Sequence, residues 1–204
     1  MHRYAAVVSS TDSGPDLTAP VGRPRSQSAR RAVLHAVDDL LVKVGYSAMT
    51  MKGIAERAGV GRQTVYRWWT TKAEILVEAS AADAATELSV SAQGTALAQL
   101  TAYLNAVNRF LTTSPAGLAY RALLGEAQHD PAVRDLVRAA DLLDRATIVV
   151  LDRIRPQAPA MPTPQLAAAQ LTGPAVITIL TTGKPLPRRM LSIHVEALLA
   201  AWQH

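Results

Sequence analysis

The stretch AERAGVGRQTVYRWWTTKAEI, residues 55–75, carries the signals of two short helices joined by a tight turn. Ala55 is small enough for a second helix to pack closely on the first, and Gly59 tolerates the positive φ angle that such a turn requires. Val65 supplies the apolar residue that the second helix must direct inward. The pattern predicts a helix-turn-helix, whose second helix enters the major groove of DNA with its N-terminal end.

Helical periodicity extends along nearly the whole chain, and no stretch alternates well enough to predict a β-sheet. An apolar stripe predicts a helix over residues 28–44, and Gly45 follows where a left-handed residue is wanted. The other predicted helices run from Thr50 to Gly59, Arg62 to about Trp69, and Thr71 to about Ser89, and then over 95–112, 116–128, 131–154, 164–182 and 187–202. We therefore expect an all-α protein.

The net charge of +5 is unevenly distributed along the 204 residues. Residues 21–72 hold ten basic and three acidic side chains, and the rest of the chain sums to −2. Four of the nine aromatic residues fall in the same segment: Tyr46, Tyr66, Trp68 and Trp69. Positive charge concentrated in this way is typical of a module that binds a polyanion.

The composition argues against several other classes of protein. Cysteine is absent, which excludes a disulfide scaffold and thiol catalysis. The five histidines form no cluster with metal-ligand spacing, and no nucleophile elbow, P-loop or G-x-G-x-x-G motif occurs. We therefore predict no metal, no cofactor and no catalytic residue. A helical enzyme that merely carries a helix-turn-helix is the alternative from another functional class.

The motif and its neighbours resemble a known family. Residues 55–75, GRPR at 22–25, the helix at 28–44 and VGYSAMTMKGIA at 44–55 are together similar to the DNA-binding domain of tetracycline-repressor (TetR) family transcription regulators. The resemblance implies a three-helix DNA-binding domain over residues 22–80 and a helical regulatory and dimerisation domain over residues 81–204. Residues 1–21, rich in small polar residues and proline, are predicted to form a disordered tail.

The resemblance implies a homodimer that binds double-stranded operator DNA and is released by a small-molecule effector. Base edges are then read by Arg62, Gln63 and Thr64, since arginine pairs with guanine and glutamine with adenine through two hydrogen bonds. The phosphate contacts that the family implies fall on Thr50, Tyr66, Arg67 and Lys72. Gly61 stands where the family often has serine, so a side-chain cap is missing.

Several of these residues have a plainer interpretation. Tyr66 could pack with its hydroxyl in water, and Lys72 could be an ordinary exposed lysine in the first turn of a helix. Arg23 and Arg25, in an arm bent by Pro24, are expected to reach a minor groove or to add nonspecific charge.

The effector site is harder to place from sequence. Thr101, Asn105, Asn108 and Thr112 form a polar but uncharged helix face, which could line a cavity or simply face solvent. The aromatic residues available for a pocket are Tyr103, Phe110 and Tyr120, although each is also a candidate for the core. We take Tyr103, Asn105, Asn108, Phe110 and Tyr120 as the candidate ligand-binding residues.

The helices near 164–182 and 187–202 are the candidate dimer interface. No charged residue lies between Pro156 and Lys184, and small residues there allow close helix approach. The apolar part of this segment is too short for a membrane span, and the N-terminal segment lacks a secretory signal, so we expect a cytoplasmic protein. A DNA-binding regulator that activates, or that needs no ligand, remains the alternative within the same class.

Overall fold

The computed structural model describes residues 23–203, with side chains from residue 26 onward, so the predicted tail at 1–21 lies outside the described residues. The helices are α1 (Arg23–Ala48), α2 (Met51–Ala58), α3 (Arg62–Tyr66), α4 (Lys72–Glu87), α5 (Ala96–Thr113), α6 (Pro115–Glu126), α7 (Pro131–Ala140), α8 (Leu142–Ile154), α9 (Pro164–Thr182) and α10 (Arg188–Gln203), with a 3-10 turn at Arg155–Gln157. The described chain contains no strand, and the all-α prediction is confirmed.

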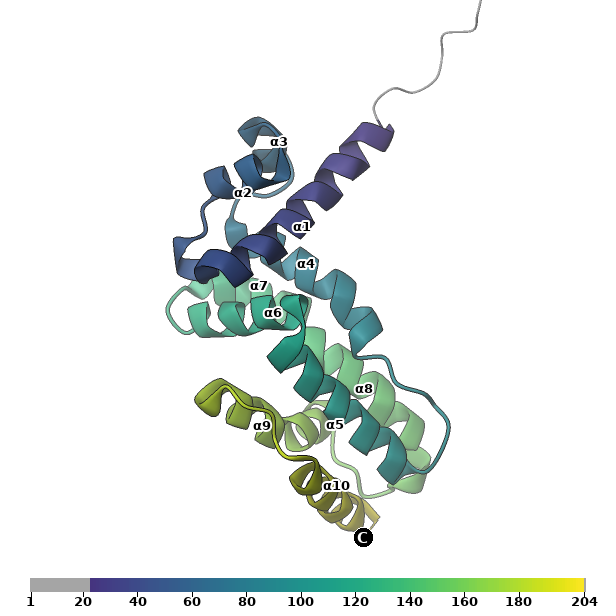
Figure 1. The fold of residues 1–204 in the computed structure, drawn as a ribbon. Helices are drawn as coiled ribbons and strands as arrows, with labels where there is room; N and C mark the ends of the chain where they lie inside the picture. Colours follow the sequence, from purple (N-terminus) through teal and green to yellow (C-terminus); the bar gives the residue numbers. More distant parts are fainter. Residues whose placement is uncertain (1–22, 204) are drawn as a thin grey trace, which may run out of the picture.

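Three helices, α1 to α3, form one end of the molecule, and α4 leads from it to the other helices (Figure 1). α1 is interrupted at Gly45, whose φ of 74° and ψ of 169° are non-helical, so the predicted stop there is confirmed. Val37, Ile54, Val65 and Leu76 meet in the buried core of this end. The side chains that the sequence pattern directs inward are therefore the ones that hold the helix-turn-helix together.

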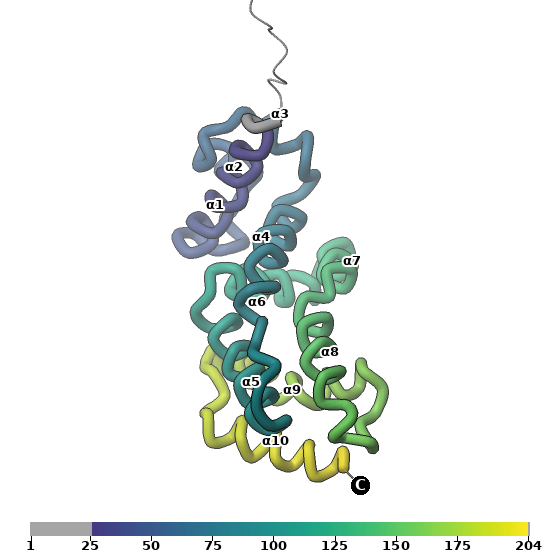
Figure 2. Tube along the Cα trace, turned by 90° about the vertical axis from the view of Figure 1, so that its right-hand side faces the viewer, coloured from purple at the N-terminus to yellow at the C-terminus, as the bar shows by residue number. Residues whose placement is uncertain are grey.

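α4 and α6 join the two ends of the molecule. Ala119 and Leu123 of α6 belong to the same apolar cluster as the helix-turn-helix core. The Ser80 hydroxyl of α4 donates a buried hydrogen bond of 2.9 Å to the Ala116 carbonyl of α6. Figure 2 shows α4 in the middle of the molecule, between α1–α3 and the C-terminal helices. The domain boundary predicted at residue 80 falls inside α4, which is one continuous helix.

The predicted single helix over 131–154 is wrong. The chain breaks at Asp141, whose φ of 49° and ψ of 43° are left-handed, and this residue ends α7 and begins α8. Neither glycine nor proline marks the break in the sequence, which explains why periodicity missed it. α3 also ends at Tyr66, before the predicted Trp69, and the chain then turns to bury the Trp69 ring.

The second core lies among α5, α6, α8, α9 and α10. Tyr103 and Phe110 of α5 are completely buried in it. The Tyr103 hydroxyl lies 2.8 Å from the Thr147 hydroxyl of α8, and the Asn108 amide donates a 2.8 Å hydrogen bond to the Leu186 carbonyl before α10. None of the helices in the described chain is long and apolar enough to cross a lipid bilayer.

Candidate DNA-binding surface

The turn between α2 and α3 is built from local backbone geometry. Thr50 caps α2 by accepting a 3.0 Å hydrogen bond from the Gly53 amide, so its hydroxyl has a structural role besides the phosphate contact predicted for it. Gly59 ends α2 in the left-handed region, with φ 67° and ψ 30°. Gly61 caps α3 without a side-chain hydrogen bond. These residues fix the angle at which α3 leaves α2.

α3 directs its polar side chains outward. Arg62 and Gln63 are exposed, Thr64 is partly exposed and Val65 is fully buried. No hydrogen bond or ion pair holds the Arg62 or Gln63 side chain within the described chain, so their donors and acceptors are available to a partner. Tyr66 is 56% exposed, which agrees with a surface contact and not with packing in the core.

The residues after α3 anchor it to the domain. Trp69 is buried and Trp68 is partly buried, with their rings edge to face at a centroid distance of 5.5 Å. The exposed Arg67 guanidinium stacks over the Trp68 ring at 4.9 Å. This stacking orients a guanidinium beside α3, where it is free to meet a phosphate.

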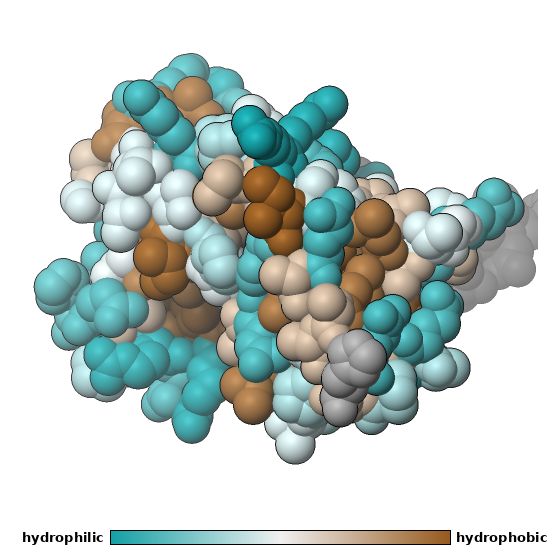
Figure 3. All heavy atoms as spheres, turned by 90° about the horizontal axis from the view of Figure 1, so that it is seen from below, coloured by the Kyte–Doolittle hydropathy of each residue, from teal (hydrophilic) through white to brown (hydrophobic). Residues whose placement is uncertain are grey.

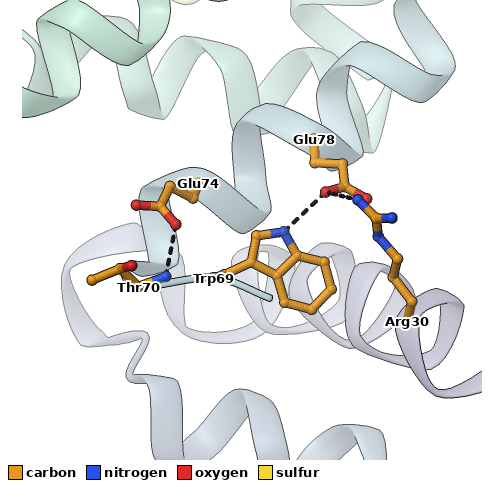
Figure 4. Close-up of polar contacts among 5 residues, drawn as sticks. All are labelled: Arg30, Trp69, Thr70, Glu74 and Glu78. Carbon is orange, nitrogen blue, oxygen red and sulfur yellow. Dashed lines mark hydrogen bonds and ion pairs between the residues drawn. The ribbon is translucent and has the colours of Figure 1, made fainter. Parts of the chain in front are cut away.

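A carboxylate on α4 ties Trp69 to α1 (Figure 4). Oε2 of Glu78 accepts a 2.9 Å hydrogen bond from the Trp69 indole and a 2.7 Å hydrogen bond from Arg30 of α1. Oε2 of Glu74, one turn earlier, accepts from the Thr70 amide at 2.7 Å. We call Arg30, Trp69 and Glu78 the Glu78 latch. The sequence did not single out Glu78, because its contacts depend on the tertiary arrangement of three helical segments.

Lys72 is turned inward. Its ammonium donates to the carbonyl of Tyr46 at 2.7 Å and of Met49 at 3.1 Å, and it lies 4.1 Å from the centre of the Tyr46 ring. Lys72 is therefore not an ordinary exposed lysine; it closes the end of α1 against the start of α4. Burial raises the pKa of the Tyr46 hydroxyl, and the charges of Glu126 and Asp130 raise it further.

Arg23 and Arg25 belong to the first turn of α1, so the predicted bent arm is wrong over this stretch: Pro24 lies near the start of a helix, where its missing N–H is tolerated. Their side chains lie outside the described residues. Their proposed contact with DNA therefore stays a prediction.

The candidate ligand-binding residues are not brought together in one cavity. Tyr103 and Phe110 are fully buried, and Asn105 donates within its own helix to the Thr101 carbonyl at 2.8 Å. Asn108 is held by Leu186. These four residues contribute to the core and to helix contacts, and none of them lines the cavity beside α8 and α9 or the cavity between α4 and α8.

Of the five candidates, Tyr120 lines a cavity of about 350 Å³ beside α8 and α9. Burial raises the pKa of its hydroxyl to about 12, and the charges of Asp144 and Asp141 act in the same direction. A larger cavity, of about 580 Å³, lies between α4 and α8 and includes Arg145 and Arg153. Sequence reasoning missed these two arginines, although their spacing of eight residues in a helical segment places them on one face.

Chemically, the surface of α3 offers hydrogen-bond donors and acceptors without a reactive centre. Within the described residues no group of three or more histidine, aspartate or glutamate side chains is arranged to hold a metal ion. Arg62 and Gln63 are exposed on a helix that Val65 anchors in the core, and such side chains are suited to recognise the edges of base pairs.

Two family models match the chain and together cover most of it. Residues 33–79 match the bacterial regulatory proteins of the tetR family, and residues 90–198 match the tetracyclin repressor-like C-terminal domain. The first match contains the helix-turn-helix, and the second runs from the segment before α5 into α10.

Curated relatives agree with this family. An uncharacterized HTH-type transcriptional regulator of Bacillus subtilis, YdeS, is 34% identical over 117 residues, which are 57% of this chain and 59% of that protein. The transcriptional repressor KstR of Mycolicibacterium smegmatis is 31% identical over 100 residues, 47% of this chain and 49% of that protein. The chain thus aligns with only about half to three fifths of the length of these relatives.

Solved structures extend the likeness to nearly the whole fold. The TetR family transcription regulator SCO0332 superposes with a TM-score of 0.72 at 26% identity, over 85% of this chain and 98% of that chain. FadR from Bacillus subtilis, solved with stearoyl-CoA, shares the fold at 18% identity and a TM-score of 0.62, over 85% of this chain and 99% of that chain. The matched families regulate transcription and are not enzymes. The chain therefore belongs to the TetR family of DNA-binding transcription regulators.

Proposed function

We propose that this regulator is a homodimeric repressor that reads its operator with α3 and leaves it when a small molecule binds the C-terminal domain. The observation that carries the proposal is the exposed pair Arg62 and Gln63, whose side chains have no partner within the described chain. A cytoplasmic location is part of the same proposal, because a protein that binds operator DNA must be where that DNA is.

Arg62, Gln63 and Thr64 read base edges, and Thr50, Tyr66 and Arg67 contact phosphates. Lys72, whose ammonium already donates to two carbonyls, contacts a phosphate with its remaining donor. Arg23 and Arg25 add charge near the same end of the molecule. The net charge of this segment supports the assignment, because phosphate neutralisation supplies most nonspecific affinity. Thr50 and Lys72 have a second role, since both also hold the start of α2 or α4 in place.

The dimer interface is formed by α9 and α10. Large apolar side chains are unusually exposed on these two helices: Leu166, Ile177, Leu180, Met190 and Ile193, of which Ile177 is 61% exposed. Seen from below, apolar residues lie at the surface of this end of the molecule among polar ones (Figure 3). Several large apolar side chains left exposed on the same two helices support a protein contact.

Release by a small molecule is supported by the cavity between α4 and α8, because α4 also carries the Glu78 latch that holds α3. Among the relatives, KstR is named a repressor, and the FadR structure contains stearoyl-CoA. A ligand that favours one position of α4 would change the position of the reading helix.

The test begins by selecting bound fragments from random DNA with the full chain, which yields the operator. Arg62→Ala and Gln63→Ala should each weaken operator binding by about 1–3 kcal/mol and relax the preference at the base pair concerned. Lys52→Ala is a control, since Lys52 is an exposed α2 lysine paired with Glu56 and outside the assignment. Unchanged affinity and base preference in both recognition variants would refute the assignment of α3.

A further inference from the structure

The cavity between α4 and α8 is a groove with small side chains on both walls. Ala81, Ala84 and Ala85 of α4 face Ala146 of α8 across it, and the short side chains leave a volume of about 580 Å³. This volume lies within the range of small-molecule sites. The groove follows α4 from Val77 to Leu88, which is about 16 Å along a helix axis.

The lining of the groove is aliphatic, with positive charge at its rim. All the apolar lining residues are alanine, valine or leucine, and no aromatic side chain is among them. The charged lining residues are Arg145 and Arg153, and no carboxylate lines the groove. Together with Val149 they occupy positions i, i+4 and i+8 of α8, on one face, and Val149 is 52% exposed.

The two arginines differ in their partners. Nε of Arg145 lies 3.9 Å from the carboxylate of Asp141, which offsets part of its charge. Arg153 donates a 3.0 Å hydrogen bond to the Val90 carbonyl and pairs with no carboxylate in the described chain. That hydrogen bond places the Arg153 guanidinium over the end of the groove near the α4–α5 connection, with donors left for an anion.

We propose that this groove binds an aliphatic carboxylate of medium chain length, whose chain lies along α4 and whose carboxylate pairs with Arg153. The proposal rests on the proposed function, because it names the effector class of that regulator. Aliphatic walls recognise the chain without selecting a ring, and the arginines select an anion over a neutral or cationic head group.

Two consecutive residues of α4 connect the groove to the DNA-binding end of the molecule. Val77 lines the groove, and the next residue, Glu78, holds Trp69 and Arg30. Val77 and Glu78 lie on one helix. A ligand whose aliphatic chain separates α4 from α8 therefore also displaces the Glu78 carboxylate, which fixes the segment after α3. The occupied groove therefore disfavours the DNA-bound position of α3.

The binding test uses the full chain without DNA and titrates decanoate below its micellar concentration by calorimetry. Decanol and decyltrimethylammonium are probes with the same chain and a neutral or cationic head. We expect decanoate to bind at least about tenfold more tightly than either probe, and Arg153→Gln to lose about tenfold in decanoate affinity. Arg109→Gln removes the same charge from an exposed site on α5 outside the groove and should leave the affinity unchanged.

A second variant tests the groove itself. Ala85→Phe fills the groove from an exposed position on α4 and should abolish decanoate binding while the circular dichroism spectrum stays helical. Equal binding of the three probes, or no effect of Arg153→Gln and Ala85→Phe, overturns the proposed ligand class. Operator release is measured separately: decanoate that binds as expected but leaves operator affinity unchanged supports the site and refutes release by this ligand.

Discussion

At the scale of single residues, Asp38 of α1 leaves one carboxyl oxygen, Oδ1, buried without a hydrogen-bond partner in the described chain. Burial raises the pKa of this carboxyl to about 6, and the negative charges of Asp83 and Asp39 also raise it, while His35 opposes them. A carboxyl group whose pKa is higher in the folded than in the unfolded state favours folding when protonated. Its contribution is present below about pH 4 and is lost as the pH rises through about 6.

Asp38→Asn should therefore stabilise the protein only where Asp38 is ionised. We expect the variant to unfold at a higher temperature than the natural chain above about pH 7, and the difference to shrink toward pH 4. Thermal unfolding followed by circular dichroism at both pH values measures this. Asp135→Asn, in an exposed ion pair with Arg138, is the control and should have a small effect at either pH. A lower unfolding temperature for Asp38→Asn at neutral pH would contradict the prediction.

Gly117 of α6 lies against the backbone of α5. A Cβ atom on this residue would lie only 1.8 Å from the Phe110 carbonyl oxygen, so the two helices approach each other where a side chain does not fit. Gly117→Ala should reduce the free energy of unfolding by about 1–3 kcal/mol or more. The added methyl group can be accommodated only if the backbone of α5 or α6 moves, because the atom in its way is not the end of a flexible side chain. Denaturant unfolding measures the change.

Gly125, on the same helix, is the matched control for this substitution. Apart from its chain neighbours and the adjacent backbone of its own helix, no atom of the described chain lies within 4 Å of the position that its Cβ would occupy. Gly125→Ala should raise the free energy of unfolding by up to about 1 kcal/mol, as expected for alanine in a helix. Equal effects of the two substitutions would mean that helix propensity, and not the contact with Phe110, determines the outcome.

At the scale of helices, the Glu78 latch connects α4 to both α1 and the segment after α3. Glu78→Ala leaves the indole N–H of the buried Trp69 without its partner, which should cost about 1–3 kcal/mol of stability. The variant should also weaken binding to all operator sequences similarly, because the base-reading residues are unchanged and only their position is less well fixed. Fluorescence anisotropy on the selected operator and on a scrambled duplex distinguishes these effects.

The control for Glu78 lies at the other end of the same helix. Glu87 accepts a 2.7 Å hydrogen bond from the Ser114 hydroxyl, and no hydrogen bond or ion pair joins its side chain to α3 in the described chain. Glu87→Ala should lower stability slightly and leave DNA affinity unchanged. Loss of DNA affinity in Glu87→Ala as large as in Glu78→Ala would attribute the effect to general loosening of α4.

The helices show how far local signals reach. The turn at Gly59, the inward Val65 and the outward Arg62 are predictable, because each depends on chain geometry within a few residues. The break at Asp141 is not, because a non-glycine residue adopts a left-handed conformation there without a sequence marker. The fate of Asn108 and Phe110 also depends on distant segments: Leu186, which accepts from Asn108, lies 78 residues away. The position of a cavity likewise depends on how segments distant in the sequence pack, because a cavity forms where their side chains leave space between them.

At the scale of the whole molecule, the two ends have different surfaces. The end with α1–α3 belongs to the segment that carries the excess positive charge, whereas α9 and α10 expose aliphatic side chains. Two copies joined through α9 and α10 would present two α3 helices to one duplex. Once the first α3 is bound, binding of the second α3 to the same duplex is intramolecular. The dimer therefore has a much higher affinity for a full operator than for a single half-site.

Ile177→Asp should separate the two copies. The substitution places a carboxylate on the most exposed large apolar position of α9, and removing an anchor from the centre of an interface typically raises the dissociation constant at least about tenfold. Sedimentation velocity at micromolar concentration should show a shift from dimer toward monomer. Affinity for the full operator should fall with it, while affinity for a single half-site should not, because α3 is unchanged.

Val42→Asp is the control: Val42 is 69% exposed but lies on α1, so the sedimentation coefficient should stay that of the natural chain. A dimer that survives both Ile177→Asp and Met190→Asp would place the interface on another face of the molecule.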